Sequence, residues 1–317
     1  MSSHTVPLGI CAATHYKDPV FMKSFSKKVA VITGAGSGMG RYLAVLLAKA
    51  GANVAICEIN PTTLAETEAM LKDYAVKVTS HIVDVADKAA IDALPAQVIE
   101  QHGQIDLVFN NAGVTVDCSF EDMSETDWDW VMNINLHGVI NGTRAFLPHL
   151  QKRPEAALIN VSSIFGMITV PNQSVYHVAK FAVRGFTECL AKELKDSKVQ
   201  VHCVHPGHIG TNIVTNARMN VRKDTVNPMQ AMMGKLIGIG STQEEMADFF
   251  RNNGMHPSRA SNIILNGVLK NRKRIFVGAD AKLMDLSQRL FPMNYDRVFP
   301  LFTMPLTLLR NKKPLNY

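Results

Sequence analysis

The sequence predicts an α/β fold: a doubly wound parallel sheet with helices on both faces. Between Lys28 and Gly278, short β-branched stretches of strand length alternate with segments of helical periodicity. Strands that alternate with helices of about 10 to 15 residues are typical of parallel sheets covered on both sides. Glycine or polar residues follow these strands, and ligands of such folds bind at the carboxyl ends of the strands. With 317 residues, the chain is long enough for one such domain with an extension at each end.

The first expected unit is the strand Lys28–Thr33, followed by Gly34-Ala-Gly-Ser-Gly-Met-Gly40 and a helix from Arg41 to Ala50. Glycines in such a turn let the backbone approach a pyrophosphate, while the N–H groups of the helix face the anion. The spacing is not G-x-G-x-x-G, because position 39 is Met, and no Gly-Lys-Ser/Thr of a P-loop follows. The glycines fit T-G-x-x-x-G-x-G instead.

The next expected strand, Asn53–Cys57, ends at Glu58, about 20 residues beyond the glycine loop. A carboxylate at this place in dinucleotide-binding folds accepts hydrogen bonds from the adenosine ribose hydroxyls. The phosphate of NADP would bring a like charge close to it, so we expect a preference for NAD. Ser37 and Arg41 lie near in sequence and could weaken that preference.

The remaining elements continue the alternation. A long helix from Asp127 to Leu150 has an unusually polar middle, Met132–Gly138. Asn135 is a candidate there to hold a water molecule or a bend; the alternative is that both asparagines of the stretch face solvent. The other elements expected are helices at Pro61–Asp73, Asp87–His102, 173–196, Pro257–Asn271 and Asp280–Leu290, and strands at Val76–Val83, Ile105–Asn110, Ala156–Val161, Val199–Val204 and Arg274–Gly278.

The strand Ala156–Val161 and the helix that begins near Gln173 carry the candidate chemistry. The strand ends in two hydroxyls, Ser162 and Ser163, and the helix places Tyr176 and Lys180 four residues apart, on one face. A tyrosine has a pKa of about 10; a neighbouring ammonium lowers it toward the range useful in acid–base catalysis. A serine hydroxyl at the strand end could hold a substrate oxygen against the phenol. Taken alone, Y-x-x-x-K also fits an ordinary amphipathic helix.

Residues 212–256 are less regular and rich in methionine, which fills irregular apolar surfaces. Long insertions after binding strands are often lids, so we expect a lid over an apolar pocket; the alternative is core or subunit contact. The methionines are Met219, Met229, Met232, Met233, Met246 and Met255.

Composition excludes several classes. The chain is 47% apolar and 19% charged, which suits a globular protein with a sizeable core. No apolar run approaches the roughly 18 to 20 residues of a membrane span, and the N-terminus does not resemble a signal peptide. The five cysteines are scattered without C-x-x-C spacing, so we expect no disulfide framework, no metal site and a reducing, cytoplasmic location.

The net charge of +6 is concentrated near the C-terminus, where residues 270–317 carry ten Lys or Arg against three Asp. No nucleic-acid-binding module accompanies this charge, so a nucleic-acid partner is not expected. Solvated charge is the default explanation. Three alternatives stay open: peripheral contact with an anionic membrane, a cover over the ligand site, and contact with another subunit.

Taken together, these stretches resemble the classical short-chain dehydrogenase/reductase family over roughly residues 27 to 280. The resemblance includes the glycine loop at 33–40, Asp84, N-N-A-G at 110–113, Asn135 in N-I-N-L-H-G, Ser163 thirteen residues before Tyr176, Y-x-x-x-K at 176–180 and P-G-x-I-x-T at 206–211. It implies one Rossmann-type domain at 27–280, with 212–256 as the substrate loop. An N-terminal arm, 1–26, precedes this domain, and a basic, apolar extension, 281–317, follows it.

The resemblance implies an NAD(P)-dependent enzyme that interconverts an alcohol and a ketone or aldehyde on a bulky apolar substrate. Tyr176 would be the general acid or base, Lys180 would lower its pKa and bind the nicotinamide ribose, Ser163 would hold the reacting oxygen and Asn135 would support a proton-relaying water. The implied cofactor contacts are Gly34, Ser37, Gly38, Met39, Gly40, Glu58, Asp84, Val85, Asn110, Ala112, Gly113, Tyr176, Lys180, Pro206, Gly207, Ile209 and Thr211.

The resemblance also implies a homodimer or homotetramer packed through the 127–150 and 173–196 helices. Two other functions stay open: a fatty-aldehyde or acyl-thioester reductase with the same site, and a cofactor-sensing binding protein without turnover.

Overall fold

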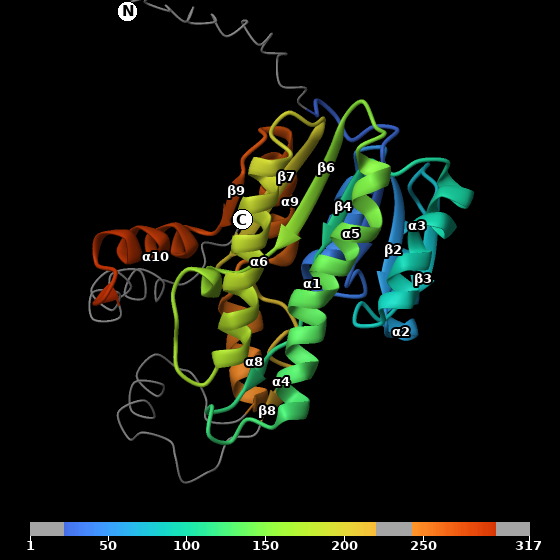
Figure 1. Cartoon of the computed structure of the whole chain (residues 1–317). Helices are drawn as coiled ribbons and strands as arrows, with labels where there is room; N and C mark the ends of the chain where they lie inside the picture. The colour runs from blue at the N-terminus through green and yellow to red at the C-terminus, as the bar shows by residue number, and fades with distance from the viewer. Residues whose placement is uncertain (1–21, 220–242, 296–317) are drawn as a thin grey trace, which may run out of the picture.

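The protein is described by a computed structural model in residues 22–219 and 243–295. Seven parallel strands form one sheet in the order β3-β2-β1-β4-β6-β7-β9 (Figure 1). Their bounds are β1 Val29–Thr33, β2 Asn53–Glu58, β3 Val78–Ile82, β4 Leu107–Asn110, β6 Ala156–Val161, β7 Val199–Pro206 and β9 Arg274–Val277. The predicted doubly wound parallel sheet is confirmed.

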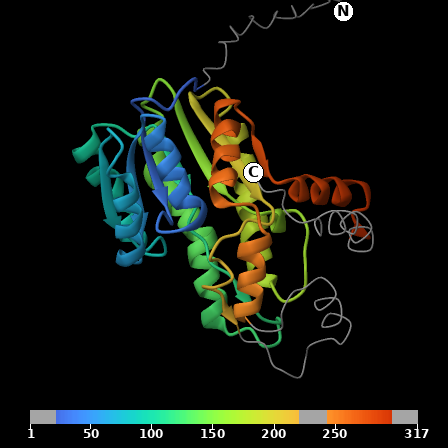
Figure 2. The same cartoon turned by 180° about the vertical axis from the view of Figure 1, so that it is seen from behind.

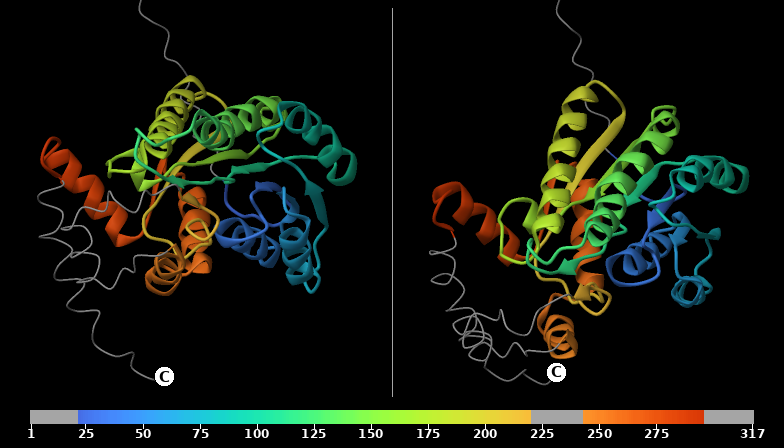
Figure 3. Two further views of the ribbon diagram at one scale, coloured as in Figure 1. Left: turned by 90° about the horizontal axis from the view of Figure 1, so that it is seen from below. Right: turned by 60° about the horizontal axis from the view of Figure 1, so that its bottom comes forward.

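Helices cover both faces of the sheet. In Figure 1, α5 (Gly138–Leu150) and α6 (Ser174–Glu193) lie in front of it, and α3 (Lys88–His102) packs on the same face. From behind, α1 (Gly38–Lys49) and α9 (Pro257–Leu269) cover the other face, with α2 (Pro61–Leu71) beside them (Figure 2). Figure 3 shows these layers from below.

The two layers exist because successive side chains of a strand point to opposite faces. In β1, Ala30 and Ile32 pack with α1 and α9, whereas Val29 and Val31 pack with α3 and α5. All five residues of this strand are buried. Burial on both faces explains why the central strands are continuous apolar runs rather than alternating ones.

The helix expected from Asp127 to Leu150 begins at Glu125 and contains a π-helical turn. It consists of α4 (Glu125–Met132), the π-helical turn at Asn133–His137 and α5. Such turns are rare and frequently lie at functional sites. The Asn135 side chain in this turn is fully buried while Asn133 is exposed, so the two asparagines do not both face solvent.

Two short strands and two further helices lie outside the main sheet and the helices on its faces. A two-stranded parallel pair joins β5 (Val116–Asp117) to β8 (Arg218–Met219), at the base of the 212–256 insertion. The insertion also contains α8 (Gln243–Asn253), and α10 (Ala279–Leu290) follows β9 and projects from the side of the molecule (Figure 1).

The described end of the N-terminal arm belongs to the core, because Met22 and Phe25 are buried in the cluster beneath α1 and α9. The division of the chain into an arm, a catalytic domain and a C-terminal extension stays a prediction.

Candidate active site

One cavity of about 1050 Å³ lies at the carboxyl ends of the central strands. It brings together most of the residues that the sequence singled out, from segments as far apart as the glycine loop and the 206–211 turn. The predicted residues on its wall are Gly34, Ser37, Gly38, Met39, Glu58, Asp84, Val85, Ala112, Gly113, Ser163, Tyr176, Lys180, Pro206, Gly207, Ile209 and Thr211. Gly40, Asn110 and Asn135 are not on the wall.

The glycine loop is shaped by close backbone approaches. Gly34 has φ +65°, and a Cβ on it would lie 2.8 Å from the Cα of Ala112. A Cβ on Gly40 would lie 2.1 Å from the carbonyl oxygen of Gly34. Gly40 therefore lets the first turn of α1 pack on the loop; its expected role as a contact stays a prediction. The narrow loop at a helix start is a cradle that side chains would fill, so it fits a pyrophosphate.

Glu58 is fixed at the end of β2 by three backbone N–H groups. Its Oε2 accepts from Gly36 N at 3.1 Å, and Oε1 accepts from Ile59 N at 2.9 Å and Asn60 N at 3.2 Å. The carboxylate thus lies on the cavity wall beside the glycine loop, as the ribose-binding prediction requires.

Arg41, whose charge could offset that of Glu58, is engaged by other groups at the same end of the cavity. Its Nη2 forms an ion pair with Glu66 Oε2 at 2.6 Å and also contacts the carbonyl oxygen of Gly36, and its Nε donates to Thr67 Oγ1 at 2.9 Å. Arg41 is not among the residues on the cavity wall.

The Asn110 side chain supports the site from inside the protein. Its Nδ2 donates to Asn160 Oδ1 at 2.8 Å and Thr143 Oγ1 at 3.3 Å, and the side chain is buried. The expected cofactor contact of Asn110 stays a prediction. The neighbouring Asn111, which the sequence analysis missed, lies on the wall instead and donates to the carbonyl oxygen of Thr33 at 2.9 Å. The N-N pair was visible in the sequence, but not which of the two faced the cavity.

Asn135 fixes the loop that follows β4. Its Nδ2 donates to the carbonyl oxygen of Val114, and its Oδ1 accepts from Val114 N, each at 2.8 Å. A Cβ on Gly113 would lie 3.3 Å from Asn135 Oδ1 and 3.5 Å from Lys180 Nζ, so both polar groups flank Gly113. The expected support of a water molecule by Asn135 stays a prediction.

Ser163, Tyr176 and Lys180 come together at the start of α6. The Ser163 side chain lies close enough to the Tyr176 hydroxyl to lower the pKa of Tyr176, and Lys180 Nζ lies 5.6 Å from the centroid of the Tyr176 ring. Lys180 also donates to the carbonyl oxygen of Val161 at 3.0 Å. Phe165 packs edge-on against the Tyr176 ring, with the two ring centroids 6.2 Å apart.

Electrostatics at this trio differ from the expectation that lysine lowers the tyrosine pKa. Burial raises the pKa of Tyr176, and the hydrogen bond from Ser163 offsets part of that rise. Burial also lowers the pKa of Lys180 to about 8. Enclosure outweighs the neighbouring ammonium because a phenolate would lose its hydration in this place. This corrects the predicted direction for the protein alone.

The comparisons with known proteins agree with this geometry. Residues 28–222 match the model of the short chain dehydrogenase family. SadH of Mycobacterium tuberculosis, a protein named as an oxidoreductase, is 38% identical over 281 residues, which are 87% of this chain and 95% of SadH. The 3-oxoacyl-[acyl-carrier-protein] reductase FabG of Thermotoga maritima is 37% identical over 184 residues, 58% of this chain and 75% of that protein.

A solved short-chain dehydrogenase/reductase from Burkholderia phymatum in complex with NAD has a TM-score of 0.73 and 25% identity, and covers 93% of this chain and 100% of that one. The chain belongs to the short-chain dehydrogenase/reductase family. At the level of that family it is an NAD(P)-dependent oxidoreductase acting on CH–OH groups.

The sequence also led us to expect no metal site, no membrane-spanning segment and no disulfide framework; the following statements concern the described residues alone. Residues 22–219 and 243–295 hold no group of three or more potential metal ligands. None of their helices has the length and apolar character needed to cross a membrane. Cys57, Cys118, Cys189 and Cys203 are free thiols.

Proposed function

We propose that the protein is an NAD-preferring dehydrogenase/reductase that interconverts a bulky apolar alcohol and its ketone or aldehyde. One observation carries this proposal: Ser163, Tyr176 and Lys180 lie on the wall of the same cavity as Glu58 and the glycine loop. Reacting groups and cofactor-binding groups thus share one cavity.

The chemistry follows from these side chains. In reduction, the Tyr176 O–H donates its proton to the carbonyl oxygen; in oxidation, the phenolate accepts the proton of the alcohol. Ser163 holds the reacting oxygen, and the Lys180 ammonium stabilises the phenolate. General acid–base catalysis of this kind contributes about 10²- to 10⁴-fold. When bound, NAD supplies or accepts the hydride, and the residues that would hold it are those of the cavity wall from Gly34 to Thr211 already named.

The preference for NAD is supported by the surroundings of Glu58. Like charges 4 Å apart repel by about 1 kcal/mol in water and about 4 kcal/mol at an effective dielectric of about 20. Arg41, the cation nearest in sequence to the glycine loop, is paired with Glu66. A 2′-phosphate would therefore meet Glu58 without compensation from Arg41.

The apolar substrate is supported by the far part of the cavity. Ile168, Phe165 and Met284 lie on its wall, as do Ile213 and Val214 from the start of the 212–256 insertion. The insertion's base is anchored by Arg218, which pairs with Asp127 Oδ1 at 2.9 Å and lies 3.8 Å above the Trp130 ring. Most of the predicted lid, residues 220–242 with Met229, Met232 and Met233, lies outside the described residues.

A fatty-aldehyde or acyl-thioester reductase is the second candidate, because the related Thermotoga maritima protein is a 3-oxoacyl-[acyl-carrier-protein] reductase. The same three side chains would perform that reduction. The assembled Ser163, Tyr176 and Lys180 count against a cofactor-sensing protein without turnover.

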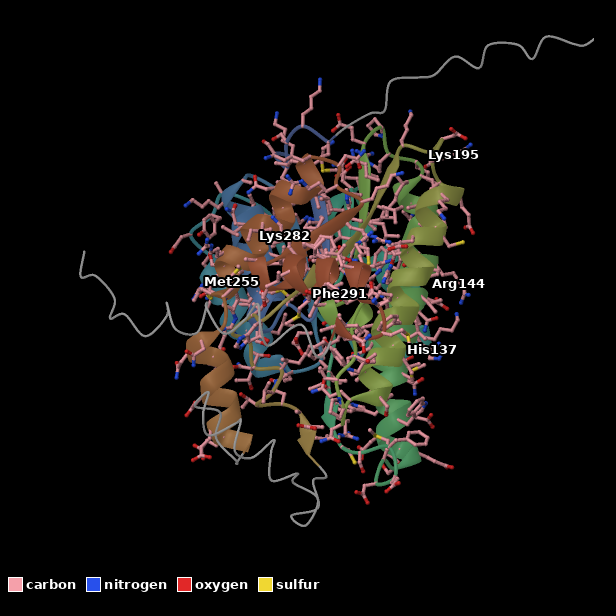
Figure 4. All side chains as sticks on the ribbon, turned by 90° about the vertical axis from the view of Figure 1, so that its left-hand side faces the viewer. His137, Arg144, Lys195, Met255, Lys282 and Phe291 are labelled. Atoms are coloured by element: carbon pink, nitrogen blue, oxygen red, sulfur yellow. The ribbon has the colours of Figure 1, made fainter. Side chains whose placement is uncertain are left out.

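We further propose a cytoplasmic homodimer or homotetramer packed through α4, α5 and α6. Val178 and Phe181, on the outer face of α6, are 45% and 39% exposed, which suits a subunit contact. Figure 4 shows His137, Arg144 and Lys195 along this edge of the molecule. We keep peripheral membrane contact through the basic C-terminal tail as part of this proposal. Residues 296–317 of that tail lie outside the described residues.

The test is a screen of alcohols with NAD and of carbonyl compounds with NADH, followed by NADH absorbance, with Tyr176→Phe as the matched control. We expect turnover of bulky neutral compounds by the wild type and at least a hundredfold lower kcat in the variant. Turnover that survives in Tyr176→Phe would overturn the assigned chemistry. Selective reduction of acyl thioesters would favour the second candidate.

A further inference from the structure

We propose that α10 and Tyr295, from the C-terminal extension, form a substrate-selecting wall that favours neutral apolar substrates over anionic ones. This inference rests on the proposed function and names the substrate class of the same site. Met284 and Tyr295 lie on the cavity wall together with Ile168 and Thr169. Segments more than a hundred residues apart in sequence therefore enclose one part of the cavity.

The link between Tyr295 and Thr169 is a two-point hydrogen bond. Thr169 N donates to the Tyr295 hydroxyl oxygen at 2.9 Å, and Thr169 Oγ1 lies 2.8 Å from the same oxygen. A hydroxyl can accept from one group while donating to another, so both contacts are satisfied together. The pair ties the chain beyond α10 to the loop that follows Ser163.

Apolar packing reinforces this link. Met284 and Tyr295 pack against a buried cluster of Ile164, Met167, Ile168 and Ala281, with Phe165 and Phe276 at its edge. This cluster joins the inner face of α10 to the loop between β6 and α6. On the outer face of α10, Leu286 is 51% exposed. Figure 4 shows Lys282 and Phe291 of this region toward the viewer, away from the edge formed by α5 and α6.

The first turn of α10 is fastened to the turn after β7. Asp280 Oδ2 accepts from His208 N at 2.6 Å, and a Cβ on Gly207 would lie 2.3 Å from the same carboxylate oxygen. Asp280 is itself on the cavity wall. The helix is thereby held at its start by Asp280 and beyond its end by Tyr295.

The position along the cavity indicates that this wall meets substrate. The wall packs on the loop that runs directly from Ser163, and Phe165 of that loop contacts the Tyr176 ring. Among the expected cofactor-binding groups, Gly34 and Glu58 come from β1 and β2, across the sheet from β9, whereas Pro206 and Gly207 at the end of β7 lie beside Asp280. A substrate whose oxygen lies at Ser163 and Tyr176 would extend its body toward Met284 and Tyr295.

The chemistry of this wall distinguishes substrate classes. A thioether, an aromatic ring and isoleucine side chains bury hydrocarbon. The carboxylate of Asp280 on the same wall repels a second anion. We therefore infer a neutral alcohol or ketone with a large hydrocarbon body, rather than a carboxylate-ended or phosphate-bearing substrate.

The experiment compares Met284→Trp, which fills the wall, with Leu286→Trp, the matched control on the outer face of α10. kcat/KM is measured over neutral secondary alcohols of about four to twelve carbons. We expect the wild type and Leu286→Trp to rise together with chain length. Met284→Trp should fall behind for the long alcohols by roughly tenfold, the effect of excluding about two methylenes. Indistinguishable profiles for the two variants would overturn the proposed wall.

A second readout separates this inference from the proposed function. Energy transfer from tryptophan to bound NADH needs no substrate, and the wild type gives the background from Trp128 and Trp130. A wall on the cofactor's cavity predicts stronger transfer in Met284→Trp than in Leu286→Trp. If no alcohol is oxidised, the proposed function is wrong. The proposed wall is tested separately: stronger energy transfer in Met284→Trp than in Leu286→Trp supports it, and equal transfer in the two variants overturns it.

A separate experiment tests whether Asp280 disfavours anionic substrates. Asp280→Asn keeps an oxygen that can accept from His208 N and removes the charge. The ratio of kcat/KM for an ω-carboxy alcohol to that for the neutral alcohol of equal length should rise at least fivefold in this variant. An unchanged ratio would remove Asp280 from the selection of substrate.

Discussion

The Asn135 side chain forms two hydrogen bonds with the backbone of Val114: Oδ1 accepts from Val114 N and Nδ2 donates to Val114 O, each at 2.8 Å. The side chain comes from a π-helical turn, and the loop that it holds carries Gly113, which lies near both Asn135 Oδ1 and Lys180 Nζ. The π-helical turn and Lys180 thus meet at one short loop.

Asn135→Ala should lower both stability and kcat. Removing the amide leaves two partly buried backbone groups of Val114 without this partner, at a cost of up to about 1–3 kcal/mol each. Asn133→Ala, in the same turn but exposed, is the matched control and should change the free energy of unfolding by less than about 0.5 kcal/mol. Urea denaturation and steady-state kinetics check both variants; equal stability in the two would contradict the bracing role.

Tyr176→Phe should abolish turnover while leaving NADH binding within about twofold of the wild type. The ring keeps its packing against Phe165, and only the transferable proton is lost, which is worth about 10²- to 10⁴-fold. The measurements are kcat and NADH affinity by fluorescence titration. A variant that retains half the wild-type kcat would exclude Tyr176 as the acid or base.

Lys180 should make cofactor binding sensitive to mildly alkaline pH. Burial lowers its pKa to about 8, so the ammonium loses its proton as pH rises through that value. We expect the affinity for NADH to fall between about pH 7 and 9 in the wild type. Lys180→Met, which is uncharged throughout, should bind more weakly at pH 7 and show no such dependence. A wild-type affinity that is flat across this range would separate the lysine charge from cofactor binding.

Glu58→Gln should shift cofactor use toward NADP. Removing the charge eliminates a repulsion of about 1–4 kcal/mol, so the NADP-to-NAD ratio of kcat/KM should rise between about fivefold and several hundredfold. Glu66→Gln tests the role of the ion pair that holds Arg41: with Glu58 intact, a freed Arg41 should raise the ratio by a smaller factor. Equal ratios in the wild type and Glu58→Gln would mean that the carboxylate does not meet the ribose.

Acid should destabilise the protein through two buried histidines on β7. Burial lowers the pKa values of His202 and His205 to about 4 from an ordinary 6.5. Because the folded pKa is the lower one, the stability is fully present above about pH 6.5 and is lost as pH falls toward 4, by up to roughly 3 kcal/mol per histidine. Urea denaturation at pH 7 and pH 4.5 measures the difference. His202→Gln should reduce it, whereas His149→Gln should reduce it by less, because burial also lowers the pKa of His149 but the side chain is only partly buried.

Local sequence determined the sheet and most of the cavity wall. Apolar runs bounded by glycine and polar residues define strands, and in a parallel sheet all the carboxyl ends lie at one edge. That geometry alone brings Gly34, Glu58, Asp84 and Ser163 together, and helical spacing adds Tyr176 to Lys180. These features depend on residues close together in the chain, so they could be predicted without the structure.

Tertiary structure decided what depends on partners distant in sequence. Asn110 and Asn111 are neighbours in sequence. The Asn110 side chain points into the protein, where it donates to Asn160, whereas Asn111 lies on the cavity wall. Burial, not the lysine four residues away, set the direction of the Tyr176 pKa. Tyr295 lies 126 residues from Thr169, and no periodicity links them. Burial and long-range hydrogen bonds arise only when separate elements pack, and this is why the sequence by itself determined the chemistry of the site but not the wall that we propose selects its substrate.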